Sequence, residues 1–137
     1  MRSVWPVNSY QLSGVSCQMQ GGGYRELKVW QRAKALVIEI YKLTTSFPKE
    51  EMYGLTNQMR RCAVSIPSNI AEGHARSGKD FLRFLDIAYG SLNELETQLD
   101  IATALEFSVH PATDILMQEI TEIGKMLNGL KRSLTDA

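Results

Sequence analysis

The 137-residue sequence has few of the residues from which disulfide, metal and catalytic sites are built. It contains two cysteines, Cys17 and Cys62, and two histidines, His74 and His110. Two cysteines are too few for a disulfide framework or a zinc site. A carboxylate-bridged di-metal bundle needs two Glu-x-x-His pairs, and neither histidine follows a glutamate by three positions. We therefore predict no catalytic residue, no metal site and no cofactor.

The sequence also lacks a long apolar run and an excess of either charge. No stretch of 18 or more apolar residues occurs, so we predict no membrane-spanning helix. Residues 1–20 have no continuous apolar segment of the kind that a secretory signal needs. Lys and Arg number 15, as do Asp and Glu, which makes the formal net charge zero. A strongly basic nucleic-acid module is excluded for the chain as a whole, and we expect a cytoplasmic protein.

The zero net charge hides an uneven distribution along the chain. Residues 1–78 carry ten basic and five acidic side chains, whereas residues 79–137 carry five basic and ten acidic ones. One consequence is that the two halves of the chain attract each other, within a subunit or between subunits. The alternative is that the first half presents a basic surface to an anionic partner.

Helical periodicity dominates the sequence from Tyr24 onward, and no strand pattern occurs. The predicted helices span about 25–46, 55–72, 79–107 and 111–133. Pro48 and Gly73 are predicted to end the first two helices, Ser77 to cap the third and Pro111 to open the fourth. Four helices of similar length with short loops predict an all-α fold, an antiparallel up-down-up-down four-helix bundle.

Two segments depart from this regular pattern. Pro67 lies inside the second predicted helix, where it removes a backbone donor and should kink the helix. Residues 1–23 have no helical or alternating period, and we predict a flexible N-terminal extension before a bundle of residues 24–137. A translation start at Met19, just before three glycines, is the alternative explanation of this extension.

The first predicted helix is apolar over more of its circumference than a bundle core requires. Its polar side chains, among them Lys28, Gln31 and Lys42, cluster in about one third of the circumference. A core-facing stripe needs to be only a little over about 100° wide. We therefore predict a second buried face that another subunit covers. A thick core beneath two neighbouring helices is the alternative.

Polar residues line the second predicted helix opposite its apolar face, and acidic residues line the third. The candidate contacts between subunits or between helices are Arg61, Ser65, Asn69, Glu72, Gly90 and Glu94. We predict that Arg61 and Glu72 pair with Glu94 or its neighbours, within or between subunits. A solvated face is one alternative. The other is an anion site built by the basic side chains of Lys28, Arg32, Arg60, Arg61 and Arg76.

Four stretches of the sequence resemble a known family. They are YRELKVWQ at 24–31, FPKEE at 47–51, RRCAVSIPSNIAEG at 60–73 and FLRFLDIAYGSLNELETQL at 81–99. Together they resemble the four-helix-bundle proteins first noticed as open reading frames inside intervening sequences of bacterial 23S ribosomal RNA genes. The resemblance implies a ring-like homo-oligomer, a pentamer, with contacts through the first three helices. Related accessory proteins of diversity-generating retroelements are similar bundles that bind RNA and a reverse transcriptase.

Two functional hypotheses stay open. In the first, the protein is a non-enzymatic homo-oligomer that offers a multivalent surface to RNA or to a nucleoprotein. The phosphate contacts would come from Arg25, Lys28, Arg32, Arg60, Arg61 and Arg76. In the second, the protein is a structural or protein-binding assembly without a nucleic-acid partner, which the zero net charge favours. Neither hypothesis involves a small-molecule substrate.

Overall fold

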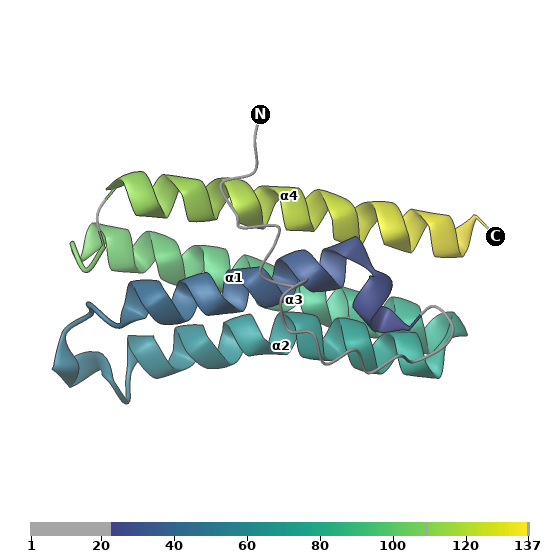
Figure 1. Cartoon of the computed structure of the whole chain (residues 1–137), viewed down its shortest axis with the longest axis horizontal. Helices are drawn as coiled ribbons and strands as arrows, with labels where there is room; N and C mark the ends of the chain where they lie inside the picture. Colours follow the sequence, from purple (N-terminus) through teal and green to yellow (C-terminus); the bar gives the residue numbers. More distant parts are fainter. Residues whose placement is uncertain (1–22, 109, 137) are drawn as a thin grey trace, which may run out of the picture.

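The computed structural model describes residues 23–108 and 110–136, which form a bundle of four helices (Figure 1). The helices are α1 (Lys28–Thr44), α2 (Leu55–Arg76), α3 (Gly78–Ala104) and α4 (His110–Thr135), with short 3-10 helices η2 (Tyr24–Glu26) and η3 (Lys49–Glu51). No strand occurs in the two described stretches. The predicted all-α four-helix bundle is confirmed.

Successive helices run in opposite directions along the long axis of the molecule (Figure 1). Each helix contacts two others: α1 and α3 both lie against α2 and α4. Within the described chain, the diagonal pairs α1–α3 and α2–α4 make no backbone contact. One end of the bundle therefore carries the starts of α1 and α3 and the ends of α2 and α4. The opposite end carries the α1–α2 and α3–α4 connections.

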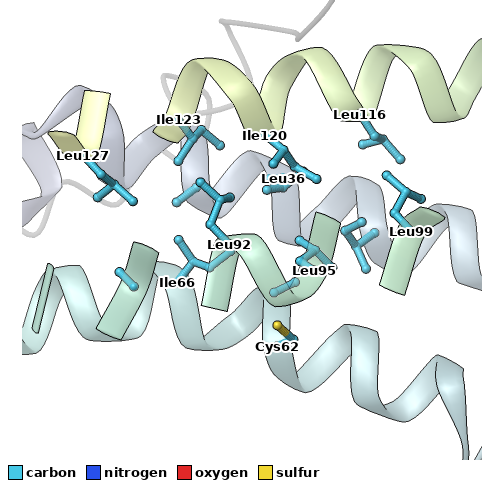
Figure 2. Close-up of a cluster of buried hydrophobic side chains, with 14 of the residues drawn as sticks. Leu36, Cys62, Ile66, Leu92, Leu95, Leu99, Leu116, Ile120, Ile123 and Leu127 are labelled. Carbon is cyan, nitrogen blue, oxygen red and sulfur yellow. The ribbon is translucent and has the colours of Figure 1, made fainter. Parts of the chain in front are cut away.

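The core is built from apolar side chains that recur at helical spacing on the inner side of each helix. In Figure 2 the side chains of Leu36, Ile66, Leu92 and Ile120 point toward one another from all four helices. Leu105, which follows α3, lies outside this core. It is 54% exposed because α3 ends at Ala104, about one turn earlier than the sequence predicts.

Gly73 does not end α2, as the sequence predicted, because the helix continues to Arg76. A Cβ atom at Gly73 would lie 2.5 Å from the Cβ of Phe84 in α3. The glycine therefore serves the close approach of α2 and α3. Ser77 separates these helices with a φ of 61°, and its side chain makes no capping hydrogen bond. The helix assignment is continuous through Pro67, and a kink there stays a prediction.

The first helix begins later than predicted. Tyr24–Glu26 forms the 3-10 helix η2, and the extended backbone of Leu27 separates it from α1, which starts at Lys28. Apart from Gly23, the flexible extension predicted for residues 1–23 lies outside the described residues, as does Cys17. No helix in the described part of the chain is long and apolar enough to cross a membrane.

Candidate interaction surfaces

The described part of the chain offers no arrangement of side chains suited to metal binding or nucleophilic chemistry. In residues 23–108 and 110–136, no three His, Cys, Asp or Glu side chains are placed to hold a metal ion. The Cys62 thiol donates to the carbonyl oxygen of Ser91 at 3.0 Å. Burial, with a smaller contribution from the charge of Glu94, raises the pKa of Cys62 to about 12. A thiol with this pKa is protonated at neutral pH and is a poor nucleophile.

Arg32, one of the six predicted nucleic-acid contacts, is occupied by an ion pair within the bundle. Its Nε and Nη2 atoms donate to the two carboxylate oxygens of Glu119 in α4, at 2.8 and 2.7 Å. The Glu119 side chain is only 5% exposed. Hydrogen bonding to Glu119 raises the pKa of Arg32, although burial opposes the shift. The pair is bidentate, so it orients the guanidinium and neutralises its charge. Arg32 therefore joins α1 to α4.

Arg60 and Arg76 are also oriented by neighbouring groups. Arg60 Nε donates to Thr44 Oγ1 at 2.9 Å, and its guanidinium lies 4.7 Å from the ring centroid of Tyr41. Arg76 donates to Glu72 at 3.2 Å, one turn earlier in α2. The Arg76–Glu72 pair is at the surface, where an ion pair contributes little and can exchange with an outside anion.

The remaining three candidates, Arg25, Lys28 and Arg61, are exposed and form no ion pair with any described residue. Arg25 lies over the rings of Tyr24 and Trp30, at 5.7 and 5.5 Å. Arg25 and Lys28 are at the end of the bundle where α1 begins, whereas Arg61 is in the first half of α2, toward the opposite end (Figure 1). The six predicted residues therefore do not form one phosphate-binding surface.

Of the predicted subunit or helix contacts, Ser65 joins α2 to α3 within the subunit, and Asn69 holds Ser65 from one turn further along α2. The hydroxyl oxygens of Ser65 and Ser91 are 2.6 Å apart, and Asn69 Nδ2 donates to the carbonyl oxygen of Ser65 at 2.7 Å. Gly90 is exposed, and a Cβ atom there would meet no atom within 4 Å. Ser91, which makes the contact with Ser65, directly follows Gly90 in the sequence.

The predicted pairing of Arg61 and Glu72 with Glu94 or its neighbours does not form among the described residues of one subunit. Glu72 pairs with Arg76 instead, and Glu94 accepts a hydrogen bond from Gln98 Nε2 at 3.4 Å. Arg61 and Glu94 are both exposed. A pairing between subunits stays a prediction.

Large apolar side chains remain exposed on the outer sides of the helices, including Ile115 of α4 at 37%. Ile38 and Tyr41 of α1, Val64 of α2, and Ile87 and Ile101 of α3 are each between 40 and 46% exposed. The core accounts for another part of the apolar surface predicted on α1, because the half-buried side chains of Trp30, Val37 and Leu43 pack against it. A thick core thus covers some of this surface and leaves Ile38 and Tyr41 uncovered.

Comparisons with known proteins confirm the family that the sequence resembles. Residues 25–129 match the model of the 23S rRNA-intervening sequence proteins. The fold is similar to the crystal structure of a protein of unknown function from the S23 ribosomal protein family of Bacteroides thetaiotaomicron, with a TM-score of 0.68 and 25% sequence identity. That match covers 75% of this chain and 97% of the other. No curated protein matches. Since the family match extends over most of the sequence, this chain belongs to the 23S rRNA-intervening sequence protein family.

Proposed function

We propose that this protein is a non-enzymatic, cytoplasmic homo-oligomer that acts by binding other macromolecules. The exposed apolar side chains of α1, α2 and α3 carry this proposal, since Ile38, Val64 and Ile101 lie on three different helices and remain at least 40% exposed. Single exposed apolar residues are ordinary on a protein surface. Their recurrence along three neighbouring helices favours a contact with another subunit.

The charges on the same helices support a contact between two unlike faces. Arg61 of α2 and Glu94 of α3 are exposed and of opposite sign. A contact that joins α2 of one subunit to α3 of the next would pair them. If each contact forms only one such Arg61–Glu94 pair, the contact is heterologous, and its repetition closes into a ring or grows into an open filament. The pentamer implied by the family resemblance is one closed arrangement of this kind.

Light scattering on the purified protein tests this assembly. We expect a native mass of several subunits of 15.4 kDa. Ile38→Asp and Ile101→Asp should each lower this mass, because each places a carboxylate in the apolar contact. Ile115→Asp on α4 is the matched control, since Ile115 is similarly exposed, at 37%, and lies outside the predicted contact. A wild-type monomer would contradict the proposal.

The partner of the oligomer is RNA or a nucleoprotein in one form of this proposal and another protein in the alternative form. The pairing of Arg32 with Glu119 weakens the originally predicted set of phosphate contacts. The zero net charge favours the structural or protein-binding assembly. The absorbance ratio at 260 and 280 nm of protein purified at low salt distinguishes the RNA-binding form of the proposal from the protein-binding form. Nucleic acid that is carried along and lost at high salt supports RNA, and clean protein absorbance supports the alternative.

A further inference from the structure

Because successive helices run in opposite directions, basic and acidic residues are distributed unequally between the two ends of the bundle. Each helix can be divided near its middle, so that every residue lies toward one end or the other (Figure 1). The end where α1 begins comprises residues 23–35, 66–90 and 123–136, and the opposite end comprises residues 36–65, 91–108 and 110–122. The first carries ten basic and five acidic residues, and the second carries four basic and ten acidic residues. We call them the basic end and the acidic end.

All four helices contribute cations to the basic end, although most of these are far apart in the sequence. Five of the cationic side chains are exposed and form no ion pair with any residue that the structure describes. They are Arg25, Lys28, Lys79, Arg83 and Arg132. The acidic residues of this end that form no ion pair with a described residue are fewer, namely Glu26, Asp80 and Asp136. The basic end therefore has an excess of cations available to an outside ligand.

The two ends also differ in exposed apolar surface. Of the nine large apolar side chains that stay exposed in the described chain, only Ile87 belongs to the basic end. A protein–protein contact is usually centred on apolar and aromatic side chains. Contacts to a phosphate backbone need cations and hydrogen-bond donors instead. The composition of the basic end fits a polyanion better than a protein partner.

A hollow between α3 and α4 places further donors at this end. Its volume is about 500 Å³, and it is lined by Leu82, Asp86, Asn128, Lys131, Arg132 and Thr135. Lys131 forms an ion pair with Asp86, whereas Arg132 forms none with the described residues. The ammonium of Lys131, the guanidinium of Arg132 and the amide of Asn128 lie around this hollow, and each can donate a hydrogen bond to a phosphate oxygen. The Thr135 hydroxyl instead donates to backbone carbonyl oxygens of its own helix.

Two aromatic rings lie beside the cations at the start of α1. Tyr24 and Trp30 are in edge-to-face contact, with centroids 5.1 Å apart, and neither is fully buried. Arg25 lies over both rings. Because Trp30 also packs against the core and Lys34 lies over its ring, these aromatic rings hold the cations at the start of α1 in place at the surface.

We infer that the basic end binds the phosphate backbone of single-stranded nucleic acid through Arg25, Lys28, Lys79, Arg83 and Arg132. This assignment rests on the RNA form of the proposed function, because it locates the surface that such a partner would occupy. The inferred surface keeps Arg25 and Lys28 from the six contacts predicted by the sequence. Lys79, Arg83 and Arg132 replace the other four. Backbone contacts carry no sequence information, so affinity should depend strongly on salt and little on base sequence.

Fluorescence anisotropy with a labelled oligouridylate, measured over a series of salt concentrations, tests this surface. The variant Lys79→Glu/Arg83→Glu changes two exposed cations of the basic end. Lys42→Glu/Lys49→Glu changes two exposed cations of the acidic end and is the matched control for net charge. We expect the basic-end variant to lose about tenfold in affinity at low salt, and its logarithmic salt slope to become shallower by about 1.4. The control should bind as the wild type does.

Equal losses in both variants would overturn the assignment to the basic end, since net charge alone would explain them. A wild-type oligomer that does not bind the oligouridylate would overturn the inference while leaving the homo-oligomer intact. Light scattering on the same samples separates these results from a failure of assembly. If Lys79→Glu/Arg83→Glu lowers the native mass and oligouridylate does not bind, the acidic end of a second copy occupies this surface, which also contradicts the inference.

Discussion

Different side chains hold the α2–α3 contact and the α1–α4 contact together. The α2–α3 contact is made by small groups: Gly73 faces Phe84, and the hydroxyls of Ser65 and Ser91 meet. The α1–α4 contact is held by a bidentate ion pair between Arg32 and Glu119. The α2–α3 contact is the most extensive in the bundle and the α1–α4 contact the least extensive of the four helix pairs. Small residues permit close packing, and a wider separation leaves room for a charged pair.

Gly73→Ala should have the largest effect, because it acts where two helices are closest. The new Cβ would lie 2.5 Å from the Cβ of Phe84, an atom that cannot move unless α3 moves. We expect the free energy of unfolding to fall by about 3 kcal/mol, at the upper end of the cost of overpacking. Urea unfolding followed by circular dichroism measures this change.

Gly90→Ala is the control for that substitution. Gly90 is in α3, exposed, with open space around its Cα, so alanine should stabilise the helix by up to about 1 kcal/mol. A stability of Gly73→Ala equal to that of the wild type would show that close packing does not specify the α2–α3 contact. A lower native mass of Gly90→Ala would place Gly90 in the subunit contact.

Arg32→Ala should have a smaller but clear effect on the α1–α4 contact. It leaves the Glu119 carboxylate, which is 5% exposed, without its partner. Breaking a fully buried pair costs about 3–5 kcal/mol, and the partial exposure of Arg32 reduces our expectation to about 2 kcal/mol. Urea unfolding of the single variant and of Arg32→Met/Glu119→Leu measures the cost of the unpaired charge.

The double variant should recover most of the lost stability, because it removes both charges together. Lys42→Ala is the surface control. It breaks the exposed pair with Glu39 and should change the free energy of unfolding by less than about 1 kcal/mol. If Arg32→Ala behaved like Lys42→Ala, the Arg32–Glu119 pair would not hold α1 against α4.

The smallest effect concerns Cys62, which packs from α2 against Ser91 of α3. Burial raises the pKa of its thiol from 9.0 to about 12. Because the folded pKa is above the unfolded one, this thiol's contribution to stability is complete below about pH 9 and is lost as the pH rises toward 12. In a Cys17→Ser background, a thiol reagent at pH 8 should react slowly with folded protein and rapidly in urea. Rapid reaction of the folded protein would contradict close packing of α2 on α3.

Several local features of this fold could be read from residue spacing. Leu116, Ile120, Ile123 and Leu127 recur at steps of four, three and four, and all are buried in the core. The spacing works because residues three and four apart share one side of a helix, whatever the neighbouring helices are. The family is likewise recognisable from contiguous residues, above all those at 60–73.

Glycines show where such local reasoning stops. Gly73 was predicted to cap α2, since glycine is favoured at helix C-termini. Its position opposite Phe84 depends on how far α2 and α3 approach each other, and no neighbouring residue in the sequence encodes that distance.

The pairing of charges depended on the tertiary structure. Arg32 and Glu119 are 87 residues apart, and only the contact between α1 and α4 brings them together. Along the sequence the charges divide between the two halves of the chain, whereas the antiparallel helices redistribute them between the two ends of the bundle. Helix formation follows from residues a few positions apart. Which charges meet, and which remain free for a partner, follows from the arrangement of whole helices.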